Sequence, residues 1–219
     1  EVPAGIGGGW DGFRGTPRLV RSFQYQNNEN PKADEILDKR GIFFDKNRSI
    51  DITTSVTGTF TTEGWAVYKY TNLQSNGEPG KNTTFPDTDF PMFRLGDVYL
   101  MYAEAVARGG EGGDLATAVN YINALRERAY GDTYHNITES WLLENNLQNI
   151  LDERCRELYW EGVRRTDLIR FGLYTSPNYL WTFKGGVLNG VGVDSRYNVF
   201  PIPTTDMSVN GNLKQNEGY

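Results

Sequence analysis

The chain has 219 residues and a formal net charge of -6, and its Lys and Arg residues are scattered along its length. Because no basic stripe is present to neutralise phosphates, this pattern argues against nucleic-acid binding and favours a neutral or weakly charged ligand. A hydrophobic content of 38% is sufficient for one domain with a core. No apolar run approaches the length of a membrane span. The single cysteine, Cys155, excludes an internal disulfide.

Residues 1–90 are rich in Gly, Asn, Thr and aromatic residues and show little sustained periodicity. A short helix is expected within residues 16–25, with Thr16 as its cap and Pro17 at its first position. A compact domain seldom contains this much irregular chain unless the loops bind a ligand or pack on a partner domain. We expect these loops both to bind a ligand and to pack on a partner domain. Runs dominated by β-branched or aromatic residues predict strands at 42–44, 50–56 and 65–70.

Helical periodicity begins at Pro91 and predicts a helix hairpin over residues 93–130. The Gly109-Gly110 pair ends the first helix, Asp114 is the expected N-cap of the second, and the small residues Ala103 and Ala118 are placed for close contact. The hairpin resembles one tetratricopeptide (TPR) unit, which needs stacked neighbours to bury its faces. The inward stripe expected for the first helix is Leu95, Val98, Tyr99, Tyr102, Ala103 and Val106.

Charged residues lie inside the apolar pattern of the next predicted helix, residues 139–161. Arg154, Glu157 and Glu161 fall close to a stripe that should face a core. A buried charge is tolerated only when it is paired and hydrogen-bonded, so these spacings suggest an internal Arg/Glu network. A solvated charged face is the alternative. A corner at Gly162 and a short helix over residues 163–171 follow, and Asp167 is expected to belong to the same network.

Three ordered motifs carry a resemblance to a known family. Residues 153–170 read ERCRELYWEGVRRTDLIR, residues 93–105 read FRLGDVYLMYAEA, and FPIP at 200–203 precedes NLKQNEGY at 212–219. Together they resemble the SusD/RagB family of surface glycan-binding lipoproteins of Gram-negative bacteria. The chain departs from the family pattern at Val163, Arg165 and Thr166, where a His and two aromatic residues are usual.

This resemblance implies a mainly α fold: a SusD-like α-helical superhelix with a TPR-like helix pair, long loops and a few short strands. Residues 91–219 would be its C-terminal helical region, and residues 1–90 a loop-rich, partly β segment that contributes to the ligand surface. Family members carry a lipid anchor and further repeats, so the chain is expected to be the C-terminal part of a longer, surface-exposed outer-membrane lipoprotein, without the anchor itself. The implied partners are a glycan, a SusC-like TonB-dependent transporter and the N-terminal half of the same protein.

Aromatic residues make up 13% of the chain and are the feature most relevant to sugars. Pyranose rings stack their C–H faces on aromatic planes, while their hydroxyls need polar partners. Trp10, Asp11, Phe13 and Arg14 supply both kinds within one short loop and form the predicted carbohydrate site. The alternative is that Trp10 and Phe13 pack under the loop as a small core. Among the other tryptophans, Trp65 and Trp160 are expected to be buried. Trp141 is expected to pack at the start of its helix, and the sequence leaves the orientation of Trp181 open.

The sequence gives little support for a catalytic site or a metal site. His135 is the only histidine and no G-x-S-x-G elbow is present, so a Ser-His-Asp hydrolase is not expected. One His and one Cys cannot form a usual zinc site, and the segment from Asp45 to Asp51 lacks the Gly and Glu of an EF-hand. We therefore expect a non-catalytic protein without a cofactor, and we assign no metal site from the sequence. Two alternatives stay open: a glycoside hydrolase that uses paired carboxylates, and a TPR-like protein-interaction scaffold without glycan binding.

Overall fold

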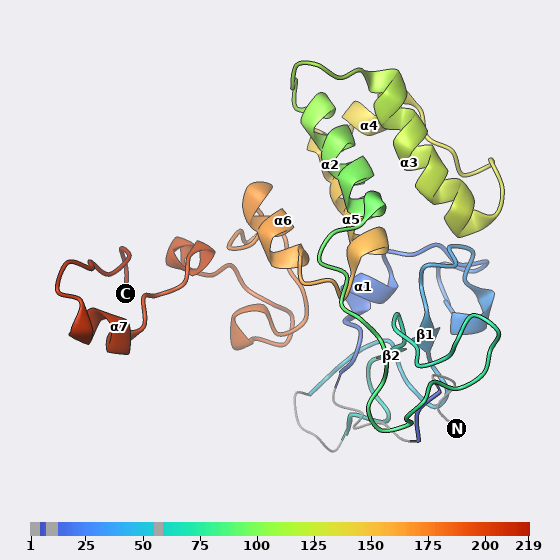
Figure 1. The fold of residues 1–219 in the computed structure, drawn as a ribbon, viewed down its shortest axis with the longest axis horizontal. Coiled ribbons are helices and arrows are strands. Elements are labelled where there is room, and N and C mark those ends of the chain that lie inside the picture. Colours follow the sequence, from blue (N-terminus) through green and yellow to red (C-terminus); the bar gives the residue numbers. More distant parts are fainter. Residues whose placement is uncertain (1–4, 8–12, 55–58) are drawn as a thin grey trace. The chain divides into compact units, whose positions relative to one another are not determined.

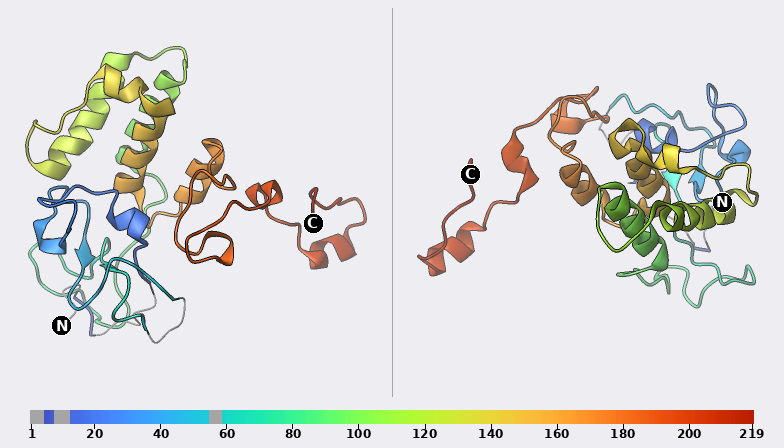
Figure 2. Two further views of the ribbon diagram at one scale, coloured as in Figure 1. Left: turned by 180° about the vertical axis from the view of Figure 1, so that it is seen from behind. Right: turned by 90° about the horizontal axis from the view of Figure 1, so that it is seen from above.

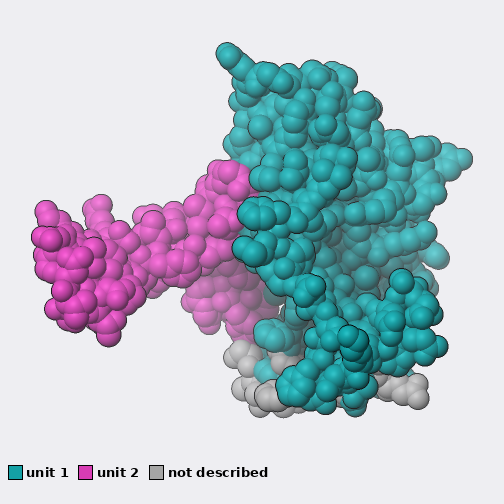
Figure 3. Space-filling model, in the orientation of Figure 1, with its two compact units in different colours: residues 1–164 teal, residues 165–219 magenta. Residues whose placement is uncertain are grey.

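A computed structural model describes residues 5–7, 13–54 and 59–219 (Figures 1 and 2). The chain forms two compact units, Glu1–Arg164 and Arg165–Tyr219 (Figure 3). The sequence predicted a change of character near residue 90, and regular helices do become dense beyond it, but the compact units divide at Arg164 instead. The reason is that the loop-rich segment packs on the later helices: the Tyr159 hydroxyl donates to the Arg40 carbonyl at 2.6 Å and accepts from the Ile42 amide at 3.2 Å.

The helical part of the first unit is built around a hairpin. Helix α2 (Leu95–Ala107) is followed by α3 (Leu115–Tyr130), which runs back alongside it, and α5 (Gln148–Leu158) also packs on α2 (Figures 1 and 2). The Asp114 side chain caps α3 by accepting from the Thr117 amide at 2.7 Å, as its position predicted. Gly131 ends α3 in the left-handed conformation, with φ of 84°.

The single helix expected over residues 139–161 is broken. Helix α4 (Glu139–Leu143) and the 3₁₀ turn η3 (Asn145–Leu147) precede α5. Asn145, Asn146 and Leu147 have φ of 54°, 50° and 62°. Three consecutive left-handed residues cannot continue a right-handed helix, so the chain changes direction there, and asparagine tolerates this region better than most residues.

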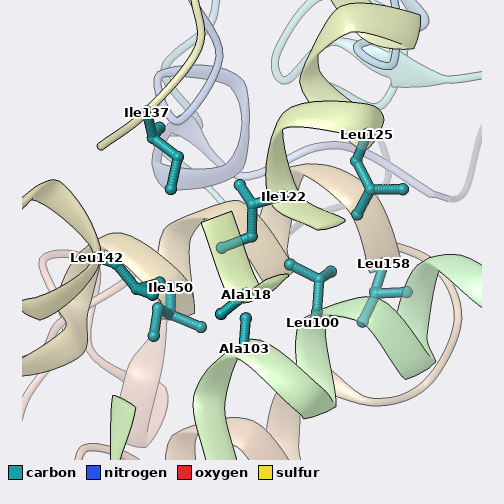
Figure 4. Packing of buried hydrophobic residues seen from close by; sticks show 9 residues of the cluster. All are labelled: Leu100, Ala103, Ala118, Ile122, Leu125, Ile137, Leu142, Ile150 and Leu158. Atoms are coloured by element: carbon teal, nitrogen blue, oxygen red, sulfur yellow. The ribbon is translucent and has the colours of Figure 1, made fainter. Parts of the chain in front are cut away.

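The main core lies where α2, α3 and α5 meet (Figure 4). Ala103 and Ala118 are both fully buried and face each other between the hairpin helices, as predicted from their small size. The predicted inward stripe of α2 was partly wrong: Leu95 and Val98 are exposed, whereas Leu100 is fully buried. The inward face of α2 is thus set by its two helical neighbours. The buried members of this core are Leu100, Ala103, Ala118, Ile122, Leu125, Ile137, Leu142, Ile150 and Leu158.

Short elements organise the N-terminal segment. Helix α1 (Pro17–Val20) is capped by the Thr16 hydroxyl, which accepts from the Leu19 amide at 3.4 Å, and the 3₁₀ helix η1 (Ala33–Glu35) follows. Strands β1 (Phe43–Phe44) and β2 (Ala66–Val67) pair antiparallel, with Phe43 opposite Val67. The strand predicted at 50–56 is absent from the described residues 50–54, and residues 55–56 lie outside the description. A second buried cluster fills this region with Val20, Phe23, Tyr25, Phe43, Trp65 and Tyr159.

The second unit contains short helices joined by loops. Its elements are α6 (Arg164–Arg170), whose first residue closes the first unit, η4 (Lys184–Gly186), η5 (Ser195–Asn198) and α7 (Thr204–Val209). Lys184 is buried, and its ammonium donates to the carbonyls of Ser176 and Tyr179 at 2.6 and 2.7 Å. In neither unit do the described residues include a helix with the length and apolarity needed to cross a membrane.

Candidate functional site

A buried ionic cluster supports the C-terminal end of α5. Glu153 and Glu157 lie one turn apart on the same face of α5, and Glu161 follows just after the helix ends. The Glu153 carboxylate, fully buried, accepts from Arg40, Arg126 and Arg156 at 2.8, 2.6 and 2.6 Å. We define the ionic cluster as the carboxylates of Asp38, Glu153, Glu157 and Glu161 with the cations of Arg40, Lys69, Arg94, Arg126, Arg128 and Arg156.

Glu157 lies at the centre of this cluster. Its carboxylate accepts from Arg94 at 2.6 Å, from Arg128 at 2.7 Å and from Arg40 at 3.1 Å, and its side chain is only 2% exposed. Burial alone would raise the pKa of Glu157, but the hydrogen bonds from Arg128 and Arg94 and the charge of Arg40 outweigh it and lower the pKa to about 2. Glu157 is therefore ionised at neutral pH and acts as an electrostatic support.

The sequence identified part of this arrangement. Glu157 and Glu161 share Arg94, which donates to both at 2.6 Å. The Arg154 guanidinium donates instead to Asp97 on α2 at 2.9 Å, and Asp167, in the second unit, accepts from Arg170 at 2.8 Å. Sequence reasoning missed Glu153, although its spacing of four from Glu157 was visible. It also missed the cations that reach α5 from distant segments: Arg40, Lys69, Arg94, Arg126 and Arg128.

An exposed pair of aromatic rings lies just beyond α5. Phe13 is 77% exposed and Trp160 41% exposed, with ring centroids 5.3 Å apart and planes at 81°. Burial was predicted for Trp160, and this was wrong. Tyr159 is buried, and Trp160 adopts a left-handed φ of 65°, so consecutive side chains take opposite environments. A non-glycine residue in this region costs about 1–2 kcal/mol, which its surroundings must offset.

Arg14, the next residue after Phe13, is held by the N-terminal loops. Its Nη1 donates to the Thr59 hydroxyl at 3.3 Å and to the Glu63 carbonyl at 3.2 Å. The guanidinium carbon also lies 4.5 Å from the centre of the Phe60 ring. Trp10 and Asp11, the other predicted carbohydrate-binding residues, lie outside the described residues. Two of the four predicted residues can thus be placed, and Trp160 is an additional exposed aromatic.

The remaining candidates occupy structural positions. His135 stacks on Tyr130 at 3.8 Å between ring centres, and its Nδ1 lies 3.0 Å from Asp132. Trp65 is buried, as predicted, and Trp141 packs at the edge of the main core. Among the residues that the structure describes, no group of three or more His, Cys, Asp or Glu side chains is arranged to hold a metal ion.

The architecture is that of SusD-like proteins. The crystal structure of a SusD-like protein from Bacteroides fragilis superposes with a TM-score of 0.62, covering 96% of this chain and 48% of that chain at 21% sequence identity. This likeness confirms the mainly helical fold class that the sequence predicted.

Sequence comparisons then show the family. The model of the SusD family matches residues 51–219, and the chain belongs to this family. The starch-binding protein SusD of Bacteroides thetaiotaomicron is 46% identical over 159 residues, which are 72% of this chain and 26% of that protein. The SusD-like protein P25 of Formosa agariphila is 33% identical over 132 residues, 58% of this chain and 24% of that protein. The chain thus spans about a quarter of the length of these curated relatives.

Proposed function

We propose that this chain contributes to the non-catalytic binding of an oligosaccharide, with Phe13 and Trp160 as a stacking platform and Arg14 as a polar contact. In the longer protein of which it would be part, the bound glycan is delivered to a SusC-like TonB-dependent transporter at the surface of the outer membrane. The single observation that carries the binding proposal is the exposed, mutually perpendicular pair of Phe13 and Trp160.

The geometry of this pair suits a sugar for two reasons. Exposed ring faces offer apolar planes to pyranose C–H groups, while an adjacent guanidinium can donate to hydroxyls. Phe13 immediately precedes Arg14, which is fixed by hydrogen bonds to Thr59 and Glu63, so the two kinds of contact come from consecutive residues of one loop. The 46% identity to a starch-binding protein makes an α-glucan the first ligand to test.

Binding to the rest of a longer protein is supported by a separate surface. Leu95, Val98 and Met101 leave an apolar face of α2 exposed, and Phe93, two residues before the helix, is 91% exposed. A TPR-like hairpin buries such faces against stacked neighbours. We therefore assign this face to the N-terminal half of the same protein.

The binding proposal is tested by isothermal titration of maltoheptaose into the whole chain. Phe13→Ala and Trp160→Gly should each weaken binding about fivefold, because one aromatic contact contributes on the order of 1 kcal/mol. Glycine is chosen at position 160 because it accepts the left-handed backbone. Tyr134→Ala, which removes a ring that is 93% exposed, is the control and should leave the affinity unchanged.

Two results would contradict the proposal. If both platform variants bind maltoheptaose and the other glycans of an array as the unmodified chain does, the aromatic pair is not the binding surface. If the chain releases shorter products from labelled oligosaccharides, the alternative of a glycoside hydrolase replaces non-catalytic binding. An array without hits, together with a co-purifying transporter, would favour the protein-interaction scaffold.

A further inference from the structure

A polar concavity of about 420 Å³ lies in the first unit. Neither Phe13 nor Trp160, which form the aromatic platform proposed above, lines it. Its wall combines the chain after α1 with side chains from α3, α4 and α5. The volume falls in the range of about 300–1,000 Å³ that is usual for small-molecule sites. The size of the concavity therefore suits a small ring-shaped ligand.

Positive charge dominates the wall of this concavity. Arg21, Arg126 and Arg156 line it, and Asp152 is the one acidic residue among its described lining residues. Arg126 and Arg156 also belong to the ionic cluster, where they share the buried carboxylate of Glu153. The cluster as defined has six cations and four carboxylates, so these shared guanidinium groups are incompletely neutralised within it. The concavity should attract an anion.

Two of the three guanidinium groups have unused hydrogen-bonding capacity. The Arg21 side chain is exposed and makes no hydrogen bond or ion pair within the part of the chain that the structure describes. The buried Nε of Arg156 also lacks a hydrogen-bond partner among the described residues and lies 3.9 Å from the Asp38 carboxylate. Arg21 is therefore the guanidinium of this wall that an incoming acceptor can reach, while Arg156 contributes its charge.

The other lining residues have the chemistry of a sugar site. Tyr130 is buried and stacks on His135, so Trp141 is the aromatic ring of the wall that a ligand can contact, with the Arg126 guanidinium 5.6 Å from its centre. Asn28 and Asn149 add amides to the same wall, and amides both donate to and accept from hydroxyls. A ligand that satisfies the whole wall would combine a ring, hydroxyls and an anionic group.

We propose that this concavity binds a carboxylated sugar, such as a uronic-acid residue, with the carboxylate directed to Arg21 and held by the positive field of Arg126 and Arg156. The concavity is a second binding site that does not depend on the aromatic platform. It would give the protein affinity for acidic sugar residues in addition to the neutral oligosaccharide proposed above.

The test is an NMR titration of the whole chain with D-glucuronate, D-glucose, acetate and inorganic phosphate. Glucuronate should bind saturably and at least about tenfold more tightly than glucose and acetate, because only glucuronate offers both the charge and the ring. Arg21→Ala should weaken glucuronate binding about tenfold. Arg18→Ala removes the same charge from α1, three residues before Arg21, but not from the concavity wall, and it should have no effect.

Two further variants separate this proposal from simpler explanations. Asp152→Asn removes the acidic lining residue and should strengthen glucuronate binding, whereas Phe13→Ala should leave it unchanged. Equal affinity for glucose would refute the role of charge, and equal affinity for acetate or phosphate would refute the role of the sugar ring. Equal losses in Arg21→Ala and Arg18→Ala would indicate a general effect of net charge and would also overturn the site.

Discussion

Replacing Glu157 by glutamine tests whether the ionic cluster stabilises the fold. Glu157→Gln keeps the shape of the side chain but removes the charge that Arg40, Arg94 and Arg128 share. Breaking a buried pair by removing one partner typically costs about 3–5 kcal/mol, because the remaining charges stay buried. The pKa gives a similar magnitude: its fall from 4.5 to about 2 corresponds to roughly 3 kcal/mol of stabilisation of the ionised form.

Urea unfolding, followed by circular dichroism, measures this effect. Urea is preferable to guanidinium chloride here because guanidinium chloride is a salt and would screen the charges under test. We expect a lower midpoint with an unchanged slope, since the same surface is exposed on unfolding. Glu144→Gln, at an exposed position after α4, is the matched control and should shift stability by less than about 0.5 kcal/mol. Equal midpoints for the two variants would refute the reasoning.

Two further outcomes concern paired charges of the first unit. Arg154→Ala leaves Asp97 without its partner in a partly buried site, so it should lower the free energy of unfolding by about 3–5 kcal/mol. An unchanged urea midpoint would mean that this ion pair is already solvated. The unmodified chain should also lose stability in acid. Because the folded-state pKa of Glu157 lies below its ordinary value, its contribution is complete above a pH of about 4.5 and disappears as the pH falls towards about 2. A urea midpoint that stays constant across this interval would contradict the assigned charge state.

Local rules predicted those elements whose beginnings and ends depend on neighbouring residues. Asp114 caps α3, and α2 ends just before the Gly109-Gly110 pair, because capping involves only the first and last turns of a helix. The hairpin of α2 and α3 follows from such rules and from helical periodicity. The break between α4 and α5 was missed because the periodicity of the surrounding residues continues across it. The adjacent Asn145 and Asn146 were the available signal.

Long-range partners could not be predicted in the same way. Periodicity indicated that charged residues of α5 face inward, but Arg40 lies 113 residues before Glu153 in the chain and no local pattern connects them. The orientation of α2 was missed for a similar reason. Leu95 and Leu100 are equally apolar, and only the packing of α3 and α5 decides that Leu100 is buried. The exposure of Trp160 depends on a backbone dihedral that residue type alone disfavours.

The ionic cluster and the aromatic platform are connected through the end of α5. The last carbonyls of a helix lack intrahelical partners and carry partial negative charge. Lys69 donates to the carbonyls of Glu157 and Tyr159 at 2.7 and 2.8 Å, and Arg94 donates to the Glu157 carbonyl at 2.7 Å. The Lys69 ammonium also lies 4.6 Å from the centre of the Tyr159 ring. These contacts fix the residue immediately before Trp160, and they offset the cost of its left-handed backbone. The charges around the end of α5 thereby also hold the exposed indole in place beside Phe13.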